Sequence, residues 1–286
     1  TTTQADNVFP LAIESDFDGC QDVVKQMFLD DDFKNKKVRF IAANSINWAR
    51  CMTQSVYFFW SYLQMLDLGK DLSFSIPSGN FGHAYAGWTA KGMGLPIQRL
   101  LIATNTNDVL HQVFSTNNYA KTSVVQTLAP SMDISVASNF ERLLYNLYED
   151  DSSELSKNMR SFPENPIKIP EQKQGMVSKF FKSYKSDDHE ILQQIRDTYT
   201  DIGYVLDPHT ATGVRASNSI VNSDESVITM GTAHPAKFAE AIERAIPEYN
   251  FNISDKVATL FEEEESFSVL SKDYFKIKDF ILSKAL

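Results

Sequence analysis

One stretch, from Leu72 to Asp108, constrains the fold of this 286-residue chain more than any other. Residues 72–77 alternate apolar and polar side chains and end at a proline, which predicts a strand. The residues SGNFG follow, then a helical pattern that ends at Gly94, and then a second strand over residues 99–104. A second helix is predicted to start near Asp108. This order of elements is a βαβ unit, which favours a parallel sheet.

The turn between the first strand and its helix suits an anionic group. Gly79 and Gly82 leave the backbone open to a ligand, and the start of the helix presents free N–H groups and a positive dipole end. Neither GxGxxG nor GxxxxGK[ST] is present, so nothing favours a dinucleotide or a P-loop nucleotide. Spacing alone favours a plain tight turn over a phosphate site.

Two longer strings indicate a family. From Ser78 to Pro96 the chain reads SGNFGHAYAGWTAKGMGLP, followed by ATNTND, and residues 232–238 read TAHPAKF. Both strings closely resemble threonine synthase, a pyridoxal-phosphate (PLP) enzyme that shares the fold of the tryptophan synthase β chain. The resemblance extends over essentially all of the chain. It implies an α/β fold (PLP-dependent fold type II): an open, mostly parallel sheet with helices on both faces and the cofactor at the carboxyl ends of the strands.

The resemblance also implies the cofactor site. The glycine turn is expected to hold the PLP phosphate, although the family usually has Asn or Asp where this chain has His83. The threonine of TAHP is expected to face the ring nitrogen of PLP. A neutral hydroxyl does not hold that nitrogen protonated, so we expect the ring to be a mild electron sink. The expected cofactor-binding residues are Gly79, Asn80, Phe81, Gly82, His83 and Thr232.

A polar segment ahead of an apolar helix predicts a second anion site. The guanidinium of Arg50, with Asn and Ser side chains at a helix start, suits a carboxylate or a phosphate. A surface arginine above N-cap residues explains the same pattern equally well. In threonine synthases a similar NSINxxR segment contributes to substrate binding, which implies that role for Asn44, Ser45, Asn47 and Arg50. The helix that runs on to about residue 66 is apolar nearly all round, so we expect it to be buried in the domain centre or at a subunit interface.

The lysine that links PLP to the enzyme is expected in a Phe-Lys-Asp context, and no lysine here has those neighbours. Lys91 lies mid-helix, and Lys237 is interpreted as a solvent-facing helix residue. No catalytic residue is therefore identified, and no metal site is predicted. We expect residues 1–286 to be the C-terminal large PLP-binding domain, a fragment inactive alone, with a looser excursion outside the core at about 151–175 and without the N-terminal domain that contains the lysine.

Two polar motifs have structural explanations. Ser138 and Glu141 match a capping box, so Glu141 is more consistent with capping than with catalysis. Asp207 and Pro208 predict a helix start, with Asp at the N-cap and Pro at the first helical position. His209 is interpreted as a packed or capping histidine, because neither a nucleophile nor a carboxylate partner can be assigned to it.

Composition excludes several classes of partner. The formal net charge of −10 argues against nucleic acid and anionic membrane. Two cysteines, Cys20 and Cys51, provide no disulfide framework, which fits a reducing compartment, and no apolar run reaches membrane-spanning length. We expect a cytoplasmic monomer or homodimer whose partner is a small-molecule substrate.

The resemblance implies a lyase that converts O-phospho-L-homoserine and water to L-threonine and phosphate. Two alternatives stay open. A sister enzyme of the same fold would degrade phosphohomoserine or phosphothreonine to a keto acid. A catalytically dead paralogue would act as a binding protein, which the departures at His83 and Gly231 permit.

Overall fold

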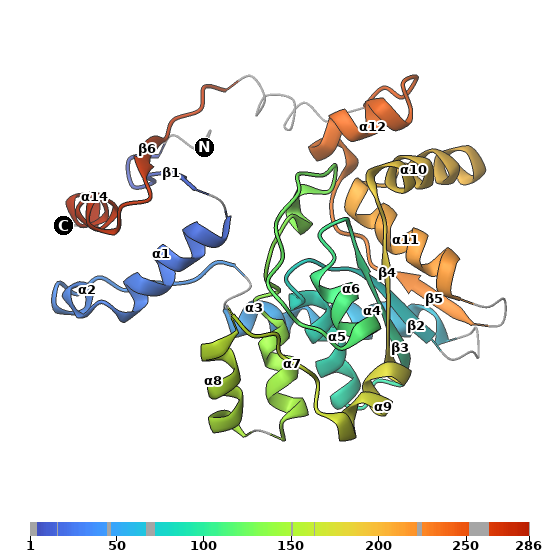
Figure 1. Ribbon diagram of the computed structural model, residues 1–286. Coiled ribbons are helices and arrows are strands. Elements are labelled where there is room, and N and C mark those ends of the chain that lie inside the picture. The colour runs from blue at the N-terminus through green and yellow to red at the C-terminus, as the bar shows by residue number, and fades with distance from the viewer. Residues whose placement is uncertain are drawn as a thin grey trace. The chain divides into compact units, whose positions relative to one another are not determined.

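The βαβ unit predicted at residues 72–108 is present in the computed structural model (Figure 1). Strand β2 (Leu72–Pro77) leads through the glycine turn into helix α5 (Gly82–Gly92), which is followed by strand β3 (Ile97–Thr104) and helix α6 (Val109–Thr116). The structure describes residues 5–15, 17–44, 47–66, 72–149, 151–162, 164–221, 225–251 and 263–285.

Four strands form one parallel sheet. Strands β4 (Phe181–Lys185) and β5 (Ser226–Thr229) complete it in the order β4-β3-β2-β5. In this register Ser75 of β2 lies between Leu101 of β3 and Thr229 of β5. Because all four strands are parallel, their carboxyl ends meet at one edge of the sheet, where the sequence predicts the cofactor.

Helices cover both faces of this sheet, as the fold class predicted. Phe74 and Ile76 of β2 point into a core shared with α5, α6, α7 (Phe140–Leu147) and α9 (Glu171–Phe180). Ser75 points to the opposite face, where its hydroxyl donates to the backbone oxygen of Gly213 in α11 (Pro208–Ile220) at 2.7 Å. The two-faced burial explains why all six residues of β2 are buried.

The apolar helix predicted up to residue 66 differs from expectation. It is broken at Gln54 into α3 (Trp48–Thr53) and α4 (Ser55–Gln64). Phe58 is fully buried, whereas Val56, Trp60 and Leu63 are 62%, 64% and 55% exposed. Burial in the domain centre is therefore wrong for most of α4, because only one of its faces packs against α5.

The segment at 151–175 is more ordered than the excursion that the sequence predicted. It contains α8 (Ser152–Ser161) and the start of α9. Ile167 pairs with Tyr119 in an antiparallel bridge, and both side chains are buried in the main core with Phe162 and Ile169. Apolar residues of this segment therefore contribute to the main core.

The contacts divide the chain into two compact units, Ala42–Tyr249 and a second unit made of Thr1–Ile41 with Asn250–Leu286. In the second unit, β1 (Leu11–Glu14) pairs in parallel with β6 (Ser268–Ser271). Its core contains side chains of α1 (Phe17–Leu29), α2 (Asp31–Asn35) and α14 (Tyr274–Ala285). The single domain predicted over 1–286, and the lack of a lysine domain, stay predictions.

The remaining elements of the first unit are short or lie at its surface: α10 (Asp188–Ile202), α12 (Ala239–Ala245), η2 (Pro130–Met132) and η3 (Pro235–Phe238). No described helix combines the length and the apolar character that crossing a membrane requires.

Candidate functional site

A pocket of about 230 Å³ lies at the carboxyl end of β2, and we call it the glycine-turn pocket. Residues of the glycine turn line it together with Thr232, which follows β5. The fold thus brings the SGNFG and TAHP segments, about 150 positions apart, to one place. The complete lining is Pro77, Ser78, Gly79, Asn80, His83, Ser131, Met132, His209, Thr232, Ala233, Lys237 and Phe238.

The turn itself is held by its own residues and by a distant loop. The backbone N–H of Gly82 donates to Asn80 Oδ1 at 2.8 Å, and the Asn80 backbone oxygen accepts from the Asn139 N–H at 2.9 Å. Phe81 occupies the left-handed region at φ 66°, which is uncommon for a residue with a side chain. Its fully buried ring packs among Phe114, Phe140 and Phe181, so the core compensates for the strain.

Gly79 is required by a close approach of backbone to backbone. A Cβ at this position would lie 3.1 Å from the Met132 Cα. The neighbouring Ser78 hydroxyl is buried and has no hydrogen-bond partner among the described atoms. An unsatisfied buried hydroxyl in a pocket wall points to a polar group that is absent from the structure.

His83 is a neutral member of the lining. Burial lowers the pKa of His83 to about 4. Gln54 Nε2 donates to the Arg50 backbone oxygen at 2.7 Å, which leaves Gln54 Oε1, 2.8 Å from His83 Nδ1, as an acceptor. The proton therefore resides on Nδ1. Sequence reasoning missed Gln54, which lies 29 positions from His83 and gives no local signal of this contact.

His209 is packed as the sequence predicted, with partners that the sequence could not identify. The Ser131 N–H donates to His209 Nε2 at 3.1 Å, and His209 Nδ1 lies 3.2 Å from Asp207 Oδ1. Both ring nitrogens are engaged, and the side chain is 4% exposed. Asp207 is the N-cap of α11, and it accepts from the backbone N–H groups of His209 and Thr210 as predicted.

Lys237 lies closer to the glycine-turn pocket than the sequence predicted. Its residue is exposed, in agreement with the solvent-facing interpretation, but it also borders the glycine-turn pocket. It belongs to the 3₁₀ turn η3, in which the His234 side chain accepts from the Ala236 N–H as N-cap. The turn directs this short segment back to the pocket.

The other expected site residues are placed differently. Phe81 and Gly82 are buried and are not among the residues that line the pocket. Asn47 is the N-cap of α3, with its Oδ1 accepting from the Ala49 N–H at 3.0 Å, and Arg50 is exposed on α3. Asn44 precedes that cap, and its backbone oxygen accepts from the Asn47 N–H. Ser45 lies outside the described residues.

These residues do not line the glycine-turn pocket, but α3 is connected to it. Gln54, at the C-cap of α3, bridges the Arg50 backbone oxygen and His83 Nδ1. The two expected anion sites therefore share one hydrogen-bonded link.

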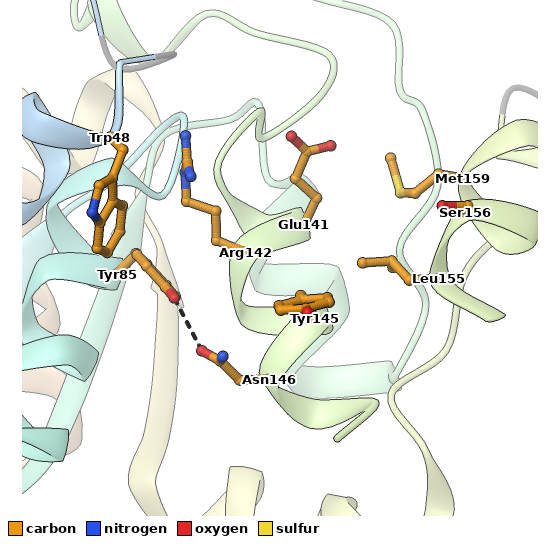
Figure 2. Close-up of a pocket in the computed structure, with 9 residues that line it drawn as sticks. All are labelled: Trp48, Tyr85, Glu141, Arg142, Tyr145, Asn146, Leu155, Ser156 and Met159. Carbon is orange, nitrogen blue, oxygen red and sulfur yellow. Dashed lines mark hydrogen bonds between the residues drawn. The ribbon is translucent and has the colours of Figure 1, made fainter. Parts of the chain in front are cut away.

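A second pocket, of about 590 Å³, lies over α7 and was not predicted (Figure 2). Trp48 and Tyr85 form one side, and Leu155 and Met159 of α8 form the other. The Arg142 guanidinium lies 5.5 Å from the centre of the Trp48 ring, and the Tyr85 hydroxyl donates to Asn146 Oδ1 at 3.0 Å.

The capping box predicted beside this pocket is wrong. Helix α7 begins at Phe140, after Asn139, and has no side-chain cap hydrogen bond. The Ser138 hydroxyl is instead buried without a partner among the described atoms. Glu141 is consequently exposed and lines the α7 pocket.

Known proteins resemble this chain in sequence. Residues 210–281 match the family model described as threonine synthase, C-terminal. The chain is 41% identical to threonine synthase of Pseudomonas aeruginosa over 283 residues, which are 98% of this chain and 60% of that protein. It is 40% identical to threonine synthase of Saccharomyces cerevisiae, over 95% of this chain and 57% of that protein.

Solved structures give the same result. The structure of PLP-bound threonine synthase from Brucella melitensis matches with a TM-score of 0.87 and 35% identity, over 99% of this chain and 61% of that chain. Yeast threonine synthase matches with a TM-score of 0.84 and 32% identity. The chain spans about 60% of the length of these two curated relatives. Over nearly its whole length, the chain is similar in sequence and in fold to these threonine synthases, and residues 210–281 match the family's C-terminal model.

Proposed function

We propose that this chain is part of a PLP-dependent threonine synthase, which converts O-phospho-L-homoserine and water to L-threonine and phosphate. One observation supports the proposal most directly. The glycine turn after β2 and Thr232 after β5, which the family resemblance assigns to opposite ends of PLP, line the same pocket.

The residues present fit the cofactor. The buried Ser78 hydroxyl has no hydrogen-bond partner among the described atoms. At Gly79, an added Cβ would lie only 3.1 Å from the Met132 Cα. Backbone N–H groups at the start of α5 suit a phosphate, because the first N–H groups of a helix have no intrahelical acceptor. Gly79, Asn80, Phe81, Gly82 and His83 would hold the phosphate end, mainly with their backbone, and Thr232 would lie at the ring nitrogen.

PLP supplies an electron sink that stabilises negative charge on substrate carbon. The chain's own residues would bind and orient the cofactor and the substrate. Arg50, with Asn44, Ser45 and Asn47, would bind the substrate's anionic groups, since a guanidinium fork matches a phosphate or carboxylate. His83 would be oriented at the phosphate end by Gln54, whose Oε1 lies 2.8 Å from His83 Nδ1.

The reaction requires a lysine from elsewhere in the protein. No lysine in this sequence has the Phe-Lys-Asp context, and Lys237, which borders the pocket, follows Pro235-Ala236 instead. We therefore propose that the chain alone is inactive and acts within a longer cytoplasmic polypeptide.

The test uses the longer protein that contains this chain, with PLP and O-phospho-L-homoserine. We expect threonine and phosphate in equal amounts, measured by amino-acid analysis and phosphate release. The Arg50→Ala variant should raise KM by roughly 10- to 100-fold, as expected for a lost charged hydrogen bond of about 1.5–3 kcal/mol, while PLP binding is unchanged. Arg244→Ala is the matched control, because Arg244 is exposed on α12 and pairs with Glu240 one turn away.

A keto acid in place of threonine would contradict the synthase assignment and identify a phospho-lyase. Normal KM in Arg50→Ala would remove Arg50 from the substrate site. No turnover at all by a folded, PLP-loaded protein would identify a binding protein.

A further inference from the structure

The hydroxyl of Thr232 has three possible acceptors in the protein. Asp207 Oδ1 lies 3.0 Å from Thr232 Oγ1, Asp207 Oδ2 lies 3.2 Å away, and Thr210 Oγ1 lies 3.1 Å away. A threonine hydroxyl has one hydrogen to donate and two lone pairs with which to accept. Its direction is therefore decided by what its neighbours can offer.

Thr210 cannot donate to Thr232. The Thr210 hydroxyl donates to Asp207 Oδ2, and its oxygen accepts from the Thr232 backbone N–H at 3.0 Å. The single hydrogen of Thr210 is thus committed to the carboxylate. Among the described atoms, the acceptors for the Thr232 hydrogen are the Asp207 carboxylate and the Thr210 oxygen, and in both arrangements Thr232 presents only lone pairs to other groups.

Asp207 is held as a carboxylate. It is 2% exposed, and burial alone would raise the pKa of Asp207. Hydrogen bonds from His209 and Thr210 outweigh burial and lower the pKa below its ordinary value. The Ala233 N–H also approaches Oδ2, at 3.3 Å. A negative charge therefore lies one hydroxyl away from whatever group Thr232 faces in the glycine-turn pocket.

We propose that Asp207 is a positioning residue that makes the Thr232 hydroxyl an acceptor toward the cofactor ring nitrogen, which favours the protonated ring. The inference rests on the proposed PLP site. An unprotonated ring nitrogen would place its lone pair against the lone pairs of Thr232 Oγ1. A protonated ring nitrogen donates to Thr232 instead, and the Asp207 charge behind the hydroxyl stabilises the added positive charge.

This inference reverses the expectation drawn from the sequence, that a neutral hydroxyl leaves the ring a mild electron sink. The residue expected at the ring is neutral, but its hydrogen has acceptors within the protein, among them a carboxylate that lies 25 positions away in the sequence. The ring is consequently a stronger electron sink than a lone threonine would make it.

The test is the Asp207→Asn variant of the longer protein, loaded with PLP that contains ¹⁵N at the ring nitrogen. The asparagine oxygen keeps the N-cap of α11, because Asn caps helices as well as Asp does. Its amide group can donate to Thr210 and Thr232, which frees the Thr232 hydrogen to point at an unprotonated nitrogen. The ¹⁵N resonance, recorded between pH 6 and 9, reports protonation without any turnover.

We expect the protonated resonance in the wild-type protein and its loss in Asp207→Asn. Asp187→Asn is the matched control, because Asp187 is likewise a helix N-cap, on α10, and does not line the pocket. In the double variant Asp207→Asn with Thr232→Asp, a carboxylate placed at the ring should restore the protonated resonance. Asp207→Ser, which also keeps a cap oxygen and removes the charge, replaces Asp207→Asn if that variant does not fold.

A protonated resonance that persists in folded Asp207→Asn or Asp207→Ser would overturn the inference and leave the proposed function intact. An unprotonated resonance in the wild-type protein would also overturn the inference and leave the proposed function intact. A wild-type protein that binds no PLP would overturn the proposed function together with the inference.

Discussion

His83 and His209 both line the glycine-turn pocket, and in each case a distant partner decides which ring nitrogen holds the proton. Gln54 accepts from His83 Nδ1, and the Ser131 N–H occupies His209 Nε2. Neither partner lies within twenty residues of its histidine in the sequence. At the scale of single residues, the site is thus a set of hydrogen-bond directions imposed by residues outside the recognisable motifs.

The buried, neutral state of His83 makes stability depend on pH. Its pKa is about 4 in the folded protein and about 6.5 in an unfolded chain. Between these values the unfolded chain binds more protons, so the free energy of unfolding should fall as the pH falls from about 6.5 to 4. His83→Asn removes this dependence and can still donate to Gln54.

The measurement is urea unfolding of both proteins at pH 7 and pH 5. The advantage of the wild-type protein over His83→Asn should be smaller at pH 5. An equal difference at the two pH values, with unchanged m-values, would show that His83 titrates alike in the folded and unfolded states.

At the scale of elements, close packing between α11 and the sheet brings the helix start at Asp207 toward the pocket. Gly213 lies where a Cβ would come within 2.9 Å of Thr229 Cγ2 and 3.1 Å of Pro77 ring atoms. Its backbone oxygen also accepts from the Ser75 hydroxyl. Helix α11 can therefore lie directly against β2 and β5, the two strands whose ends present the glycine turn and Thr232.

Gly213→Ala should consequently destabilise the protein, by about 1–3 kcal/mol for an overpacked site. Gly175→Ala is the matched control in α9, where a Cβ meets no atom within 4 Å. Gly175→Ala should raise the free energy of unfolding by about 0.5–1 kcal/mol, because alanine has a higher helix propensity than glycine. Urea unfolding of the two variants measures both effects, and equal shifts of the same sign would refute the packing argument.

At the scale of the whole molecule, α4 presents an apolar face that the described parts of the chain leave exposed. Val56, Trp60 and Leu63 recur at helical spacing and are each more than half exposed. Contiguous apolar surface of this kind mediates association or binds apolar dyes. The chain alone should therefore bind such a dye.

The double change Val56→Lys with Trp60→Glu should lower dye fluorescence and self-association of the chain without loss of stability, because neither side chain is buried. Ile202→Lys is the matched control, since Ile202 is 74% exposed at the end of α10, away from this face. Dye fluorescence and sedimentation measure the effect. A similar decrease in the control variant would show that the signal does not come from α4.

Much of the local structure could be predicted from the sequence. The βαβ unit at 72–108 and the Asp207 N-cap with Pro208 both follow from rules that act over a few neighbouring positions. The same rules failed at Ser138 and Glu141, where the Asn139 N–H bonds to the Asn80 backbone oxygen and α7 starts one residue later than predicted. A long-range contact replaced a local cap.

The sequence by itself determined the resemblance to threonine synthase, the fold class and the segments expected to form the site, because motifs and periodicity depend on neighbouring residues. Only the tertiary structure decided that Asp207 and Thr210 lie within hydrogen-bond distance of Thr232 Oγ1, and that most of α4 stays exposed. The reason is the strand order β4-β3-β2-β5, in which β2 pairs with a strand about 150 residues later in the chain. No local pattern specifies that neighbour, and the chemistry of the pocket depends on it.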